Sequence, residues 1–108
     1  MNNDKVLSFL GLVKKAGKLE IGEESCGAAQ RSGKARLILV AADAASGTAK
    51  RASNYAEWGK TPLITLRYTK DELGDMLGRR VCAVLAVTDR GFAAALAKKL
   101  ADDEVTRT

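Results

Sequence analysis

The sequence predicts an α/β fold, a three-layer αβα sandwich with a four-stranded mixed sheet. Two segments, residues 37–41 and 81–87, are apolar throughout, which is typical of strands that are buried on both faces. Segments with helical and with strand periodicity alternate along the chain. Because a strand without a polar face cannot border water, helices must cover both sides of the sheet.

The first third of the chain predicts two helices and an edge strand. Four apolar residues at spacings of three and four predict an amphipathic helix over residues 5–16, ended by Gly17. They are Val6, Phe9, Leu10 and Val13. Residues 19–21 alternate in polarity and predict a short edge strand. Residues 23–32 predict a helix with acids in its first turn, and Gly33 ends it.

The first apolar strand, residues 37–41, leads into a turn at residues 43–47. We expect Thr48 to cap a third helix that runs to Trp58. The next strand covers residues 62–66 and begins at the chain's one proline, where a missing N–H matters least.

The last third predicts two helices around the second apolar strand. Thr69 and Glu72 have the spacing of a capping box, which places a helix over residues 70–77, ended by Gly78. Asp89 caps a final helix. We therefore expect one domain over residues 1–101 and a frayed tail over residues 102–108.

The composition favours a single cytoplasmic domain that binds phosphate groups. The chain has 108 residues, 46% of them hydrophobic, and a net charge of +5, and compact basic domains commonly bind nucleic acid or anionic lipid. No apolar run approaches the roughly 20 residues of a membrane-spanning helix, and the first residues lack the basic start of a signal peptide. We expect no membrane partner.

The residues argue against enzyme classes that use histidine, a metal or a nucleotide cofactor. The chain has no histidine, the commonest general base and zinc ligand. The glycine spacing from Gly22 to Gly27 is that of a phosphate-binding loop, but Ala28 and Ala29 stand where that loop requires Lys and Ser or Thr. We therefore expect no enzyme, no cofactor and no metal.

The two cysteines, Cys26 and Cys82, lie far apart in the sequence. We interpret them as reduced core residues. A thiol-dependent enzyme that uses Cys26 is an open alternative, because that cysteine lies in the first turn of its helix.

Basic residues gather at helix ends and in loops, where they can reach phosphates. One group surrounds the end of the second helix and consists of Arg31, Lys34 and Arg36, and another precedes the last strand and consists of Arg79 and Arg80. The remaining basic residues at helix ends are Lys14, Lys15, Lys18, Lys50 and Arg51. Cations near helix C-termini also complement the helix dipole without any ligand. Arg79 and Arg80 instead precede apolar Val81 and Cys82, a combination suited to an RNA backbone and an unstacked base.

Seven short blocks together resemble one family. The chain resembles the bacterial YlxQ-type branch of the kink-turn-binding large-subunit ribosomal-protein superfamily over almost its whole length. The blocks are Phe9-Leu10-Gly11-Leu12, Ala16-Gly17-Lys18-Leu19, Gly22-Glu23-Glu24, Gly33-Lys34-Ala35-Arg36-Leu37, Ala41-Ala42-Asp43-Ala44-Ala45, Thr69-Lys70-Asp71-Glu72-Leu73-Gly74 with Gly78, and Val87-Thr88-Asp89-Arg90-Gly91-Phe92-Ala93.

The resemblance implies an αβα sandwich that binds a sharply bent RNA internal loop. By this resemblance, Gly22 matches the family glycine that approaches tandem sheared G·A pairs. Residues 80–82 match the loop that holds an extruded nucleotide, and Asp43 lies in the turn that faces this loop. Glu24 and Ser25 stand where the family typically has Asn and Glu, and Ala28 where it usually has a lysine. The RNA-binding residues that we predict are Gly22, Glu23, Glu24, Ser25, Arg31, Lys34, Arg36, Asp43, Arg79, Arg80, Val81 and Cys82.

The leading hypothesis is a non-enzymatic RNA-binding protein of a ribosomal or translation-related ribonucleoprotein. Its expected partners are structured RNA such as ribosomal RNA, together with ribosomal or ribonucleoprotein proteins, and we expect a monomer. The alternative is a protein-interaction adaptor on the same fold, in which a surface of small residues packs against a partner. That surface consists of Ser25, Gly27, Ala28 and Ala29.

Overall fold

The computed structural model describes residues 4–107 and contains a four-stranded mixed sheet of order β1-β4-β2-β3. The strands are β1 (Leu19–Ile21), β2 (Leu37–Val40), β3 (Leu63–Thr65) and β4 (Val84–Val87). β4 is antiparallel to both β1 and β2, whereas β2 and β3 are parallel. The mixed sheet and the short edge strand β1 agree with the sequence prediction.

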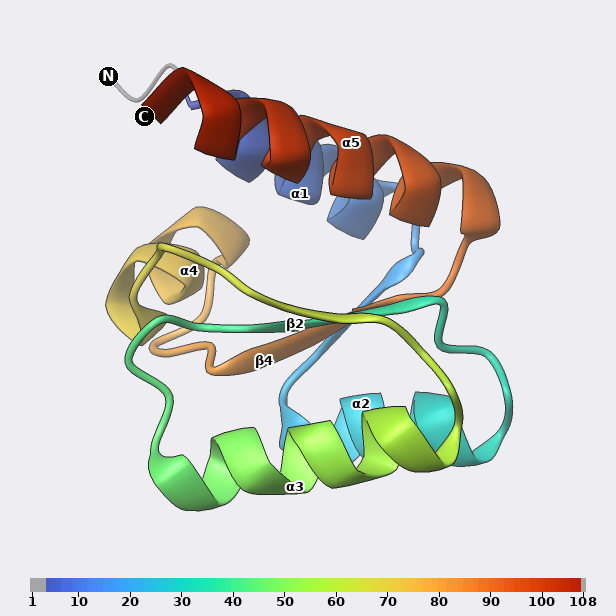
Figure 1. Ribbon diagram of the computed structural model, residues 1–108. Helices are drawn as coiled ribbons and strands as arrows, with labels where there is room; N and C mark the ends of the chain where they lie inside the picture. The colour runs from blue at the N-terminus through green and yellow to red at the C-terminus, as the bar shows by residue number, and fades with distance from the viewer. Residues whose placement is uncertain (1–3, 108) are drawn as a thin grey trace.

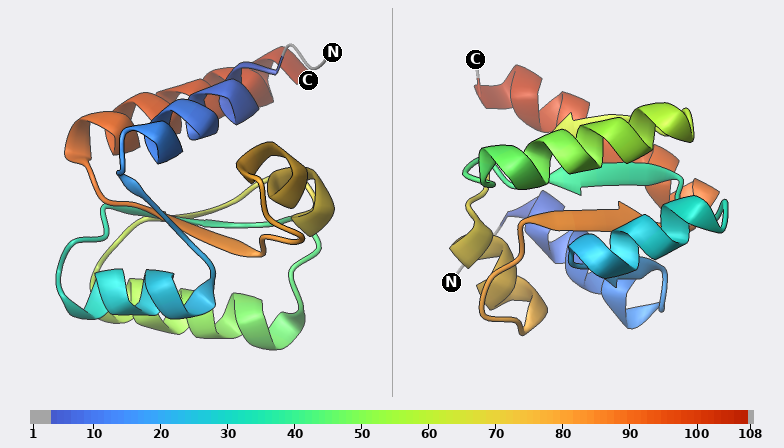
Figure 2. Two further views of the ribbon diagram at one scale, coloured as in Figure 1. Left: turned by 180° about the vertical axis from the view of Figure 1, so that it is seen from behind. Right: turned by 90° about the horizontal axis from the view of Figure 1, so that it is seen from below.

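Helices cover both faces of the sheet, as predicted. They are α1 (Lys5–Lys15), α2 (Glu23–Arg31), α3 (Ser46–Trp58), α4 (Lys70–Leu77) and α5 (Arg90–Arg107). Figure 1 shows α1, α4 and α5 on one face and α2 with α3 on the other, and the right-hand view of Figure 2, seen from below, shows α2 and α3 next to each other. None of the described helices is long and apolar enough to cross a membrane.

The two central strands are buried on both faces and divide their side chains between two cores. Because side chains alternate along a strand, the odd-numbered residues of β2 face α1, α4 and α5 and its even-numbered residues face α2 and α3. The first core is rich in leucine, whereas the second uses the alanines Ala29, Ala52 and Ala56. This pattern explains why both strands lack polar residues.

The capping residues of α4 and α5 were predicted correctly, because each bonds to a backbone N–H only three residues away. The Thr69 hydroxyl accepts from the Glu72 N–H and the Glu72 carboxylate accepts from the Thr69 N–H, which completes the predicted capping box of α4. The Asp89 carboxylate accepts from the Phe92 N–H at the start of α5. The prediction for Thr48 was wrong, because α3 already begins at Ser46 and Ala45 is its N-cap residue.

A further boundary differs from the sequence prediction. The last strand begins at Val84 rather than at residue 81, because hydrogen bonds to α4 hold the preceding residues out of the sheet: the Cys82 N–H donates to the Lys70 carbonyl and the Arg79 N–H to the Gly74 carbonyl. The final helix α5 extends to Arg107, and the fraying expected over residues 102–108 stays a prediction.

The strand directions define two ends of the sheet. β1, β2 and β3 finish at one end, where β4 begins. We call this the Gly22 end, comprising residues 22–25, 41–45, 66–70 and 79–83. The other end, where β1, β2 and β3 begin and β4 finishes, is the Arg36 end, comprising Lys18 and residues 33–36, 59–62 and 88–90.

Candidate nucleic-acid interface

The start of α2 is open at the Gly22 end. Gly22 has a φ of 99°, and a Cβ there would meet no protein atom within 4 Å. Its N–H donates to the Val84 carbonyl (N···O 3.0 Å), and its carbonyl accepts from Cys26, the first bond of the helix. The N–H groups of Glu23, Glu24 and Ser25 therefore have no helical partner, and Gly22 brings no side-chain cap. These donors are available to an acceptor on a ligand.

The segment of residues 79–83 lies at the same end and is held by its backbone. The Ala41 N–H donates to the Ala83 carbonyl (2.9 Å), and the Cys82 N–H donates to the Lys70 carbonyl (3.0 Å). Gly74 of α4 lies directly against this segment, because a Cβ there would come within 2.8 Å of the Arg80 carbonyl oxygen. The segment is thus fixed against both β2 and α4.

The side chains of this segment divide between surface and core. Arg79 and Arg80 are exposed, and Val81 is an exposed large apolar residue with 57% of its surface accessible. The Cys82 side chain is buried in the core, and its thiol donates to the Val84 carbonyl. Of the four predicted contact residues, only the first three present side chains at the surface, and Cys82 anchors the segment instead.

Asp43 also lies at the Gly22 end, where it joins two elements. Its Oδ1 accepts from the Lys70 N–H (2.8 Å) at the first residue of α4. The neighbouring Ala42 N–H donates to the Tyr68 carbonyl (2.8 Å). The Ala41–Ala83 and Cys82–Lys70 hydrogen bonds bring this turn close to the segment before β4, and Asp43 acts as a second cap for α4.

Glu23 has a partner that the sequence analysis did not predict. Arg51 of α3 forms an ion pair with Glu23 through its Nε and donates a further bond from Nη2 to Oε2 (3.2 Å). The hydrogen bond from Arg51 holds the pKa of Glu23 below its usual range. No local signal indicates this pair, because 28 residues separate its members. Glu24, the other acid in the first turn of α2, is exposed to solvent.

Three predicted site residues do not join the others. Arg31, Lys34 and Arg36 lie around the C-terminal end of α2, and the Arg36 N–H donates to the carbonyl of Val87, the last residue of β4. They belong to the Arg36 end, because α2 runs from one end of the sheet to the other. The predicted set of basic residues is therefore split between two ends of the molecule.

The adaptor surface proposed from small residues is not formed as expected. Gly27 and Ala29 are buried in the layer of α2 and α3, and only Ala28 of the four residues is fully exposed. These small residues therefore serve mainly to pack α2 against its neighbours.

The two thiols are poor nucleophiles. Cys26 is fully buried, and burial raises its pKa far above the ordinary thiol value. Burial also raises the pKa of Cys82 to about 11. A reactive cysteine requires a lowered pKa and access to solvent, so neither supports a thiol-dependent enzyme. The described residues contain no cluster of acids and thiols suited to a metal ion.

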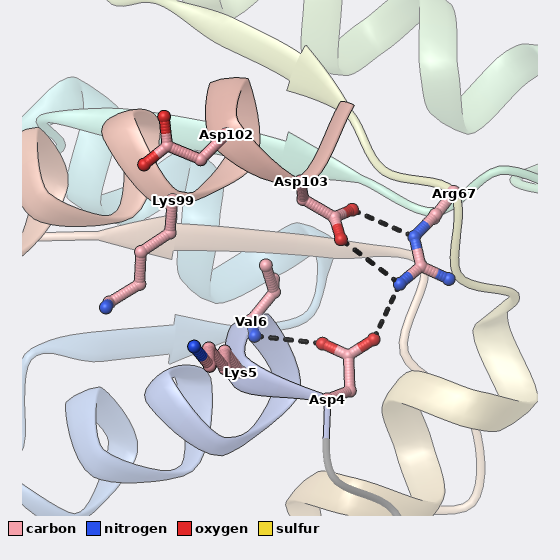
Figure 3. Close-up of a pocket in the computed structure, with 7 residues that line it drawn as sticks. All are labelled: Asp4, Lys5, Val6, Arg67, Lys99, Asp102 and Asp103. Atoms are coloured by element: carbon pink, nitrogen blue, oxygen red, sulfur yellow. Dashed lines mark hydrogen bonds and ion pairs between the residues drawn. The ribbon is translucent and has the colours of Figure 1, made fainter. Parts of the chain in front are cut away.

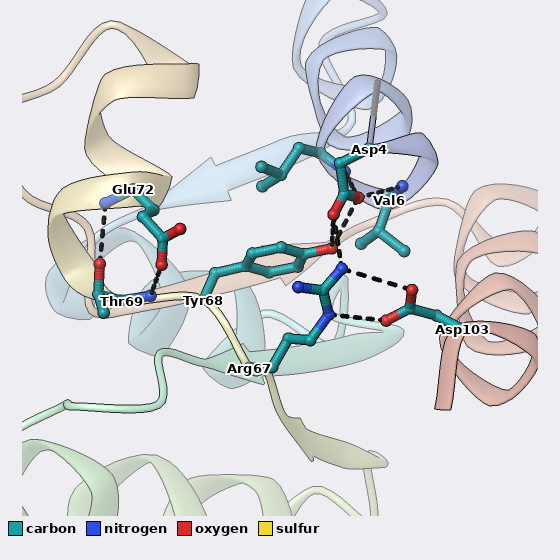
Figure 4. Close-up of polar contacts among 8 residues, drawn as sticks. Asp4, Val6, Arg67, Tyr68, Thr69, Glu72 and Asp103 are labelled. Carbon is teal, nitrogen blue, oxygen red and sulfur yellow. Dashed lines mark hydrogen bonds and ion pairs between the residues drawn. The ribbon is translucent and has the colours of Figure 1, made fainter. Parts of the chain in front are cut away.

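A third charged region joins the start of α1 to the end of α5. A hollow of about 480 Å³ lies there, and Figure 3 shows residues that line it, among them Asp4, Arg67 and Asp103. Arg67 donates to Asp103 through Nε (2.9 Å) and to Asp4 through Nη2 (2.7 Å), and the Tyr68 hydroxyl donates to Asp4 (2.6 Å), as Figure 4 shows. These charges pair with one another, so we interpret the region as structural.

Comparison with known proteins identifies the family of this sandwich. A model of the ribosomal protein L7Ae/L30e/S12e/Gadd45 family matches residues 4–97, which include both segments at the Gly22 end. The chain belongs to this family. The L7Ae/L30e family match thus agrees with the superfamily inferred from the sequence blocks.

Individual relatives of the L7Ae/L30e family align over most of their length. The chain is 34% identical to the RNA-binding protein YlxQ of Enterococcus faecium, over 85% of this chain and 87% of the relative. It is 35% identical to RNA-binding protein YlxQ of Bacillus subtilis, over 79% and 84%. It is also 33% identical to the large ribosomal subunit protein eL30 of Candida albicans, over 83% and 86%. The predicted resemblance to the YlxQ-type branch is confirmed.

A solved structure shares the fold. A protein with unknown function from Bacillus halodurans superposes with a TM-score of 0.82 and 30% identity, covering 89% of this chain and 96% of that one. The predicted α/β sandwich of the L7Ae/L30e family is therefore confirmed.

Proposed function

We propose that this chain is a non-enzymatic RNA-binding protein that recognises a kink-turn-type internal loop through its Gly22 end. Its target is a structured RNA such as ribosomal RNA, in a ribosomal or translation-related ribonucleoprotein of the cytoplasm, and the protein acts as a monomer. Membership of a family of ribosomal proteins and similarity to relatives named RNA-binding protein and large ribosomal subunit protein support this proposal.

One observation carries the proposal of RNA binding at the Gly22 end. Residues 22–25 and residues 79–81 lie at the same end of the sheet, although at least 54 positions separate them in the sequence. The first presents unpartnered N–H groups beside an open glycine, and the second presents two exposed cations and an exposed apolar side chain. The Gly22–Val84 hydrogen bond holds the first segment to the start of β4, which the second segment precedes, and the Ala41–Ala83 hydrogen bond holds the second segment to the end of β2.

Each segment has a role in this proposal. The N–H groups of residues 23–25 donate to acceptors on base edges, and the Glu24 carboxylate accepts from guanine N–H groups. Arg79 and Arg80 neutralise phosphates near the bend. Val81 provides an apolar surface for a nucleotide that leaves the stack. Asp43 positions α4, whose Gly74 supports the second segment.

A binding titration tests the proposal. A fluorescently labelled RNA duplex with an internal loop of tandem sheared G·A pairs is compared, at two salt concentrations, with the same duplex closed by Watson–Crick pairs. We expect saturable binding to the first and much weaker binding to the second. Equal, salt-sensitive binding to both would reject recognition of the loop and leave only general RNA binding. Binding to neither would favour the adaptor alternative.

Variants locate the site within the same assay. Arg79→Gln/Arg80→Gln removes two cations from the Gly22 end, and we expect affinity for the loop RNA to fall at least tenfold, from about 1 to 3 kcal/mol per lost contact. Lys5→Gln/Lys98→Gln is the matched control, since both lysines are exposed and lie on α1 and α5, outside residues 22–25 and 79–81. Equal losses in the two variants would show that net charge alone matters.

A further inference from the structure

The Arg36 end contains a hollow that lies apart from the RNA site proposed at the Gly22 end. Its volume is about 240 Å³, and residues from separate parts of the chain line it. Gln30 comes from α2, Arg36 precedes β2, Lys60 follows α3 and Arg90 begins α5. Because β2 and β3 begin where β4 ends, the topology brings these residues together although they are distant in the sequence.

Gln30 is a buried polar residue without a partner. Only 4% of its surface is exposed, and the Oε1 atom of its amide is fully buried. Neither amide atom of its side chain forms a hydrogen bond within the described residues. A buried amide that makes no hydrogen bond costs free energy, so a ligand that supplies partners to this amide is favoured.

The Gln30 amide extends toward the loop that follows α3. The helices α2 and α3 run in the same direction and end next to each other, as Figure 1 shows. A Cβ at Gly59 would lie 1.6 Å from the Nε2 atom of Gln30, so glycine leaves the space that the amide occupies. Since Gln30 and Gly59 both line the hollow, the amide borders it. The terminal torsion of a glutamine is soft, so the amide can turn either of its polar atoms toward a ligand.

Cations surround the hollow, and no acid lines it. The charged residues of its lining are Arg36, Lys60 and Arg90. None of the three forms an ion pair within the part of the chain that the structure describes. The C-terminal ends of α2 and α3 favour nearby cations, but they leave the Gln30 amide without a partner. The lining therefore suits an anion that also carries a hydrogen-bond donor.

We propose that this hollow binds a small phosphate monoester whose carbon skeleton carries hydroxyl groups, such as a sugar phosphate or glycerol phosphate. Arginine binds phosphate through paired donors and lysine as a point charge, so Arg36, Arg90 and Lys60 hold the phosphate group. A hydroxyl of the ligand donates to Gln30 Oε1, and a ligand oxygen accepts from Nε2. A carboxylate offers no donor and would leave Oε1 unpaired. The site goes beyond the proposed function, because residues 22–25 and 79–81 do not line it.

Glycerol phosphate is the probe, because it combines a phosphate monoester with hydroxyl groups. Calorimetric titration compares it with glycerol, which lacks the phosphate, and with sulfate, an anion that has no hydroxyl donor at neutral pH. Gln30 is the one glutamine of the chain, so the signal pair that disappears in Gln30→Met assigns its amide in a proton–nitrogen correlation spectrum. We expect glycerol phosphate to bind about tenfold more tightly than either comparison compound and to shift the Gln30 amide signals.

Two variants test the lining. Gln30→Met keeps an unbranched side chain but removes the amide, so we expect it to unfold at a denaturant concentration no lower than that of the wild type and to bind glycerol phosphate about tenfold more weakly. Lys60→Gln/Arg90→Gln removes two exposed cations and should lower the affinity for glycerol phosphate by at least about tenfold. Lys5→Gln/Lys98→Gln is the charge-matched control and should bind glycerol phosphate as the wild type does.

Unshifted Gln30 amide signals, or equal affinities of Lys60→Gln/Arg90→Gln and its control, would overturn the proposal. Equal binding of sulfate and glycerol phosphate would also overturn it, since the amide would then have no role. The RNA site is read separately, because the internal-loop RNA should bind Lys60→Gln/Arg90→Gln and the control equally, whatever the result with glycerol phosphate. A loss confined to RNA binding would assign these cations to RNA and reject the phosphate monoester.

Discussion

At the scale of single residues, two glycines make the Gly22 end possible for different reasons. Gly22 adopts a φ of 99°, in the region that side chains rarely adopt, and leaves the first N–H groups of α2 uncovered. Gly74 has an ordinary helical place but lies against the backbone of Arg79 and Arg80. One glycine is required by conformation and the other by close packing, and the sequence does not distinguish the two.

Gly74→Ala should displace the segment before β4. An added Cβ would approach the carbonyl oxygens of Arg79 and Arg80 to 2.9 and 2.8 Å, so the backbone must move, which we expect to cost about 1 to 3 kcal/mol of unfolding free energy and to weaken RNA binding. Gly11→Ala in α1 is the control, because its Cβ would meet only the flexible end of Met76 at 3.5 Å.

The helix preference of alanine over glycine should make Gly11→Ala stabilising by up to about 1 kcal/mol. Chemical denaturation measures both variants, and the labelled RNA reports the loop. A Gly74→Ala variant as stable as Gly11→Ala would contradict the packing that we describe.

At the scale of elements, a cluster of polar side chains ties three helices together. The Asp4 carboxylate caps α1 by accepting from the Val6 and Leu7 N–H groups, and it also accepts from Tyr68 before α4 and from Arg67, which in turn binds Asp103 of α5. Figure 4 shows these bonds converging on Asp4 and Arg67. Through Arg67, the cluster links Asp103 of α5 to Asp4 at the start of α1.

The cluster makes stability depend on pH. Burial opposes ionisation of Asp4, but the hydrogen bonds from Tyr68, Leu7 and Val6 and the charge of Arg67 outweigh it and hold its pKa below the usual range. Since the folded pKa is lowered, the ionised carboxylate stabilises the fold above the unfolded pKa near 3.8, and this contribution is lost as the pH falls through the folded pKa.

Asp4→Asn should lower the unfolding free energy at neutral pH by about 1 to 3 kcal/mol. It should also reduce the further loss of stability that the wild type shows on acidification from about pH 5 to pH 2. Denaturant titrations of both proteins across this range provide the measurement. Parallel pH profiles for the two proteins would show that Asp4 does not contribute to the acid sensitivity.

At the scale of the whole molecule, the sheet has two separate ends and two cores. The sheet order places residues 22–25 and 79–83 at one end and Lys18, Lys34, Arg36, Lys60 and Arg90 at the other, and α2 runs from one end to the other. It also places Cys26 in the core beneath α2 and α3 and Cys82 in the core beneath α1, α4 and α5. The two thiols therefore report on the two layers independently.

Neither cysteine should react with iodoacetamide in the folded protein at neutral pH, because both are buried and their thiol pKa values are raised. Both should react rapidly in denaturant. Mass spectrometry after a timed pulse counts the modified thiols at each denaturant concentration. Rapid modification of Cys26 in the native state would contradict its burial and would revive the thiol-enzyme alternative.

Much of the fold was predictable because its signals are local or periodic. The α4 capping box, the glycines after α1 and α4, and the apolar strands were recognised from neighbouring residues. Two boundaries differ from the prediction. The helix α3 starts before Thr48, and the Cys82 N–H donates to the distant Lys70 carbonyl rather than to a neighbouring strand.

The candidate site was predictable only in part. The first segment at the Gly22 end was found from a family block and the second from its two arginines before apolar residues, and the structure places both at one end of the sheet. The partner of Glu23 and the burial of Cys82 could not be found, because they depend on which helix packs beside α2 and on which face of the chain turns inward.

The sequence by itself determined the fold class, the number and kind of elements and the residues that can carry charge, since these follow from periodicity, capping and composition. Only the tertiary structure decided how those charges are shared between the two ends. α2 crosses the sheet from Gly22 to the Arg36 end, so residues within fifteen positions of one another lie at opposite ends. The strand order, meanwhile, joins residues 22 and 84 by a hydrogen bond. Proximity in the sequence and proximity in space are therefore separated by the direction of each strand and helix.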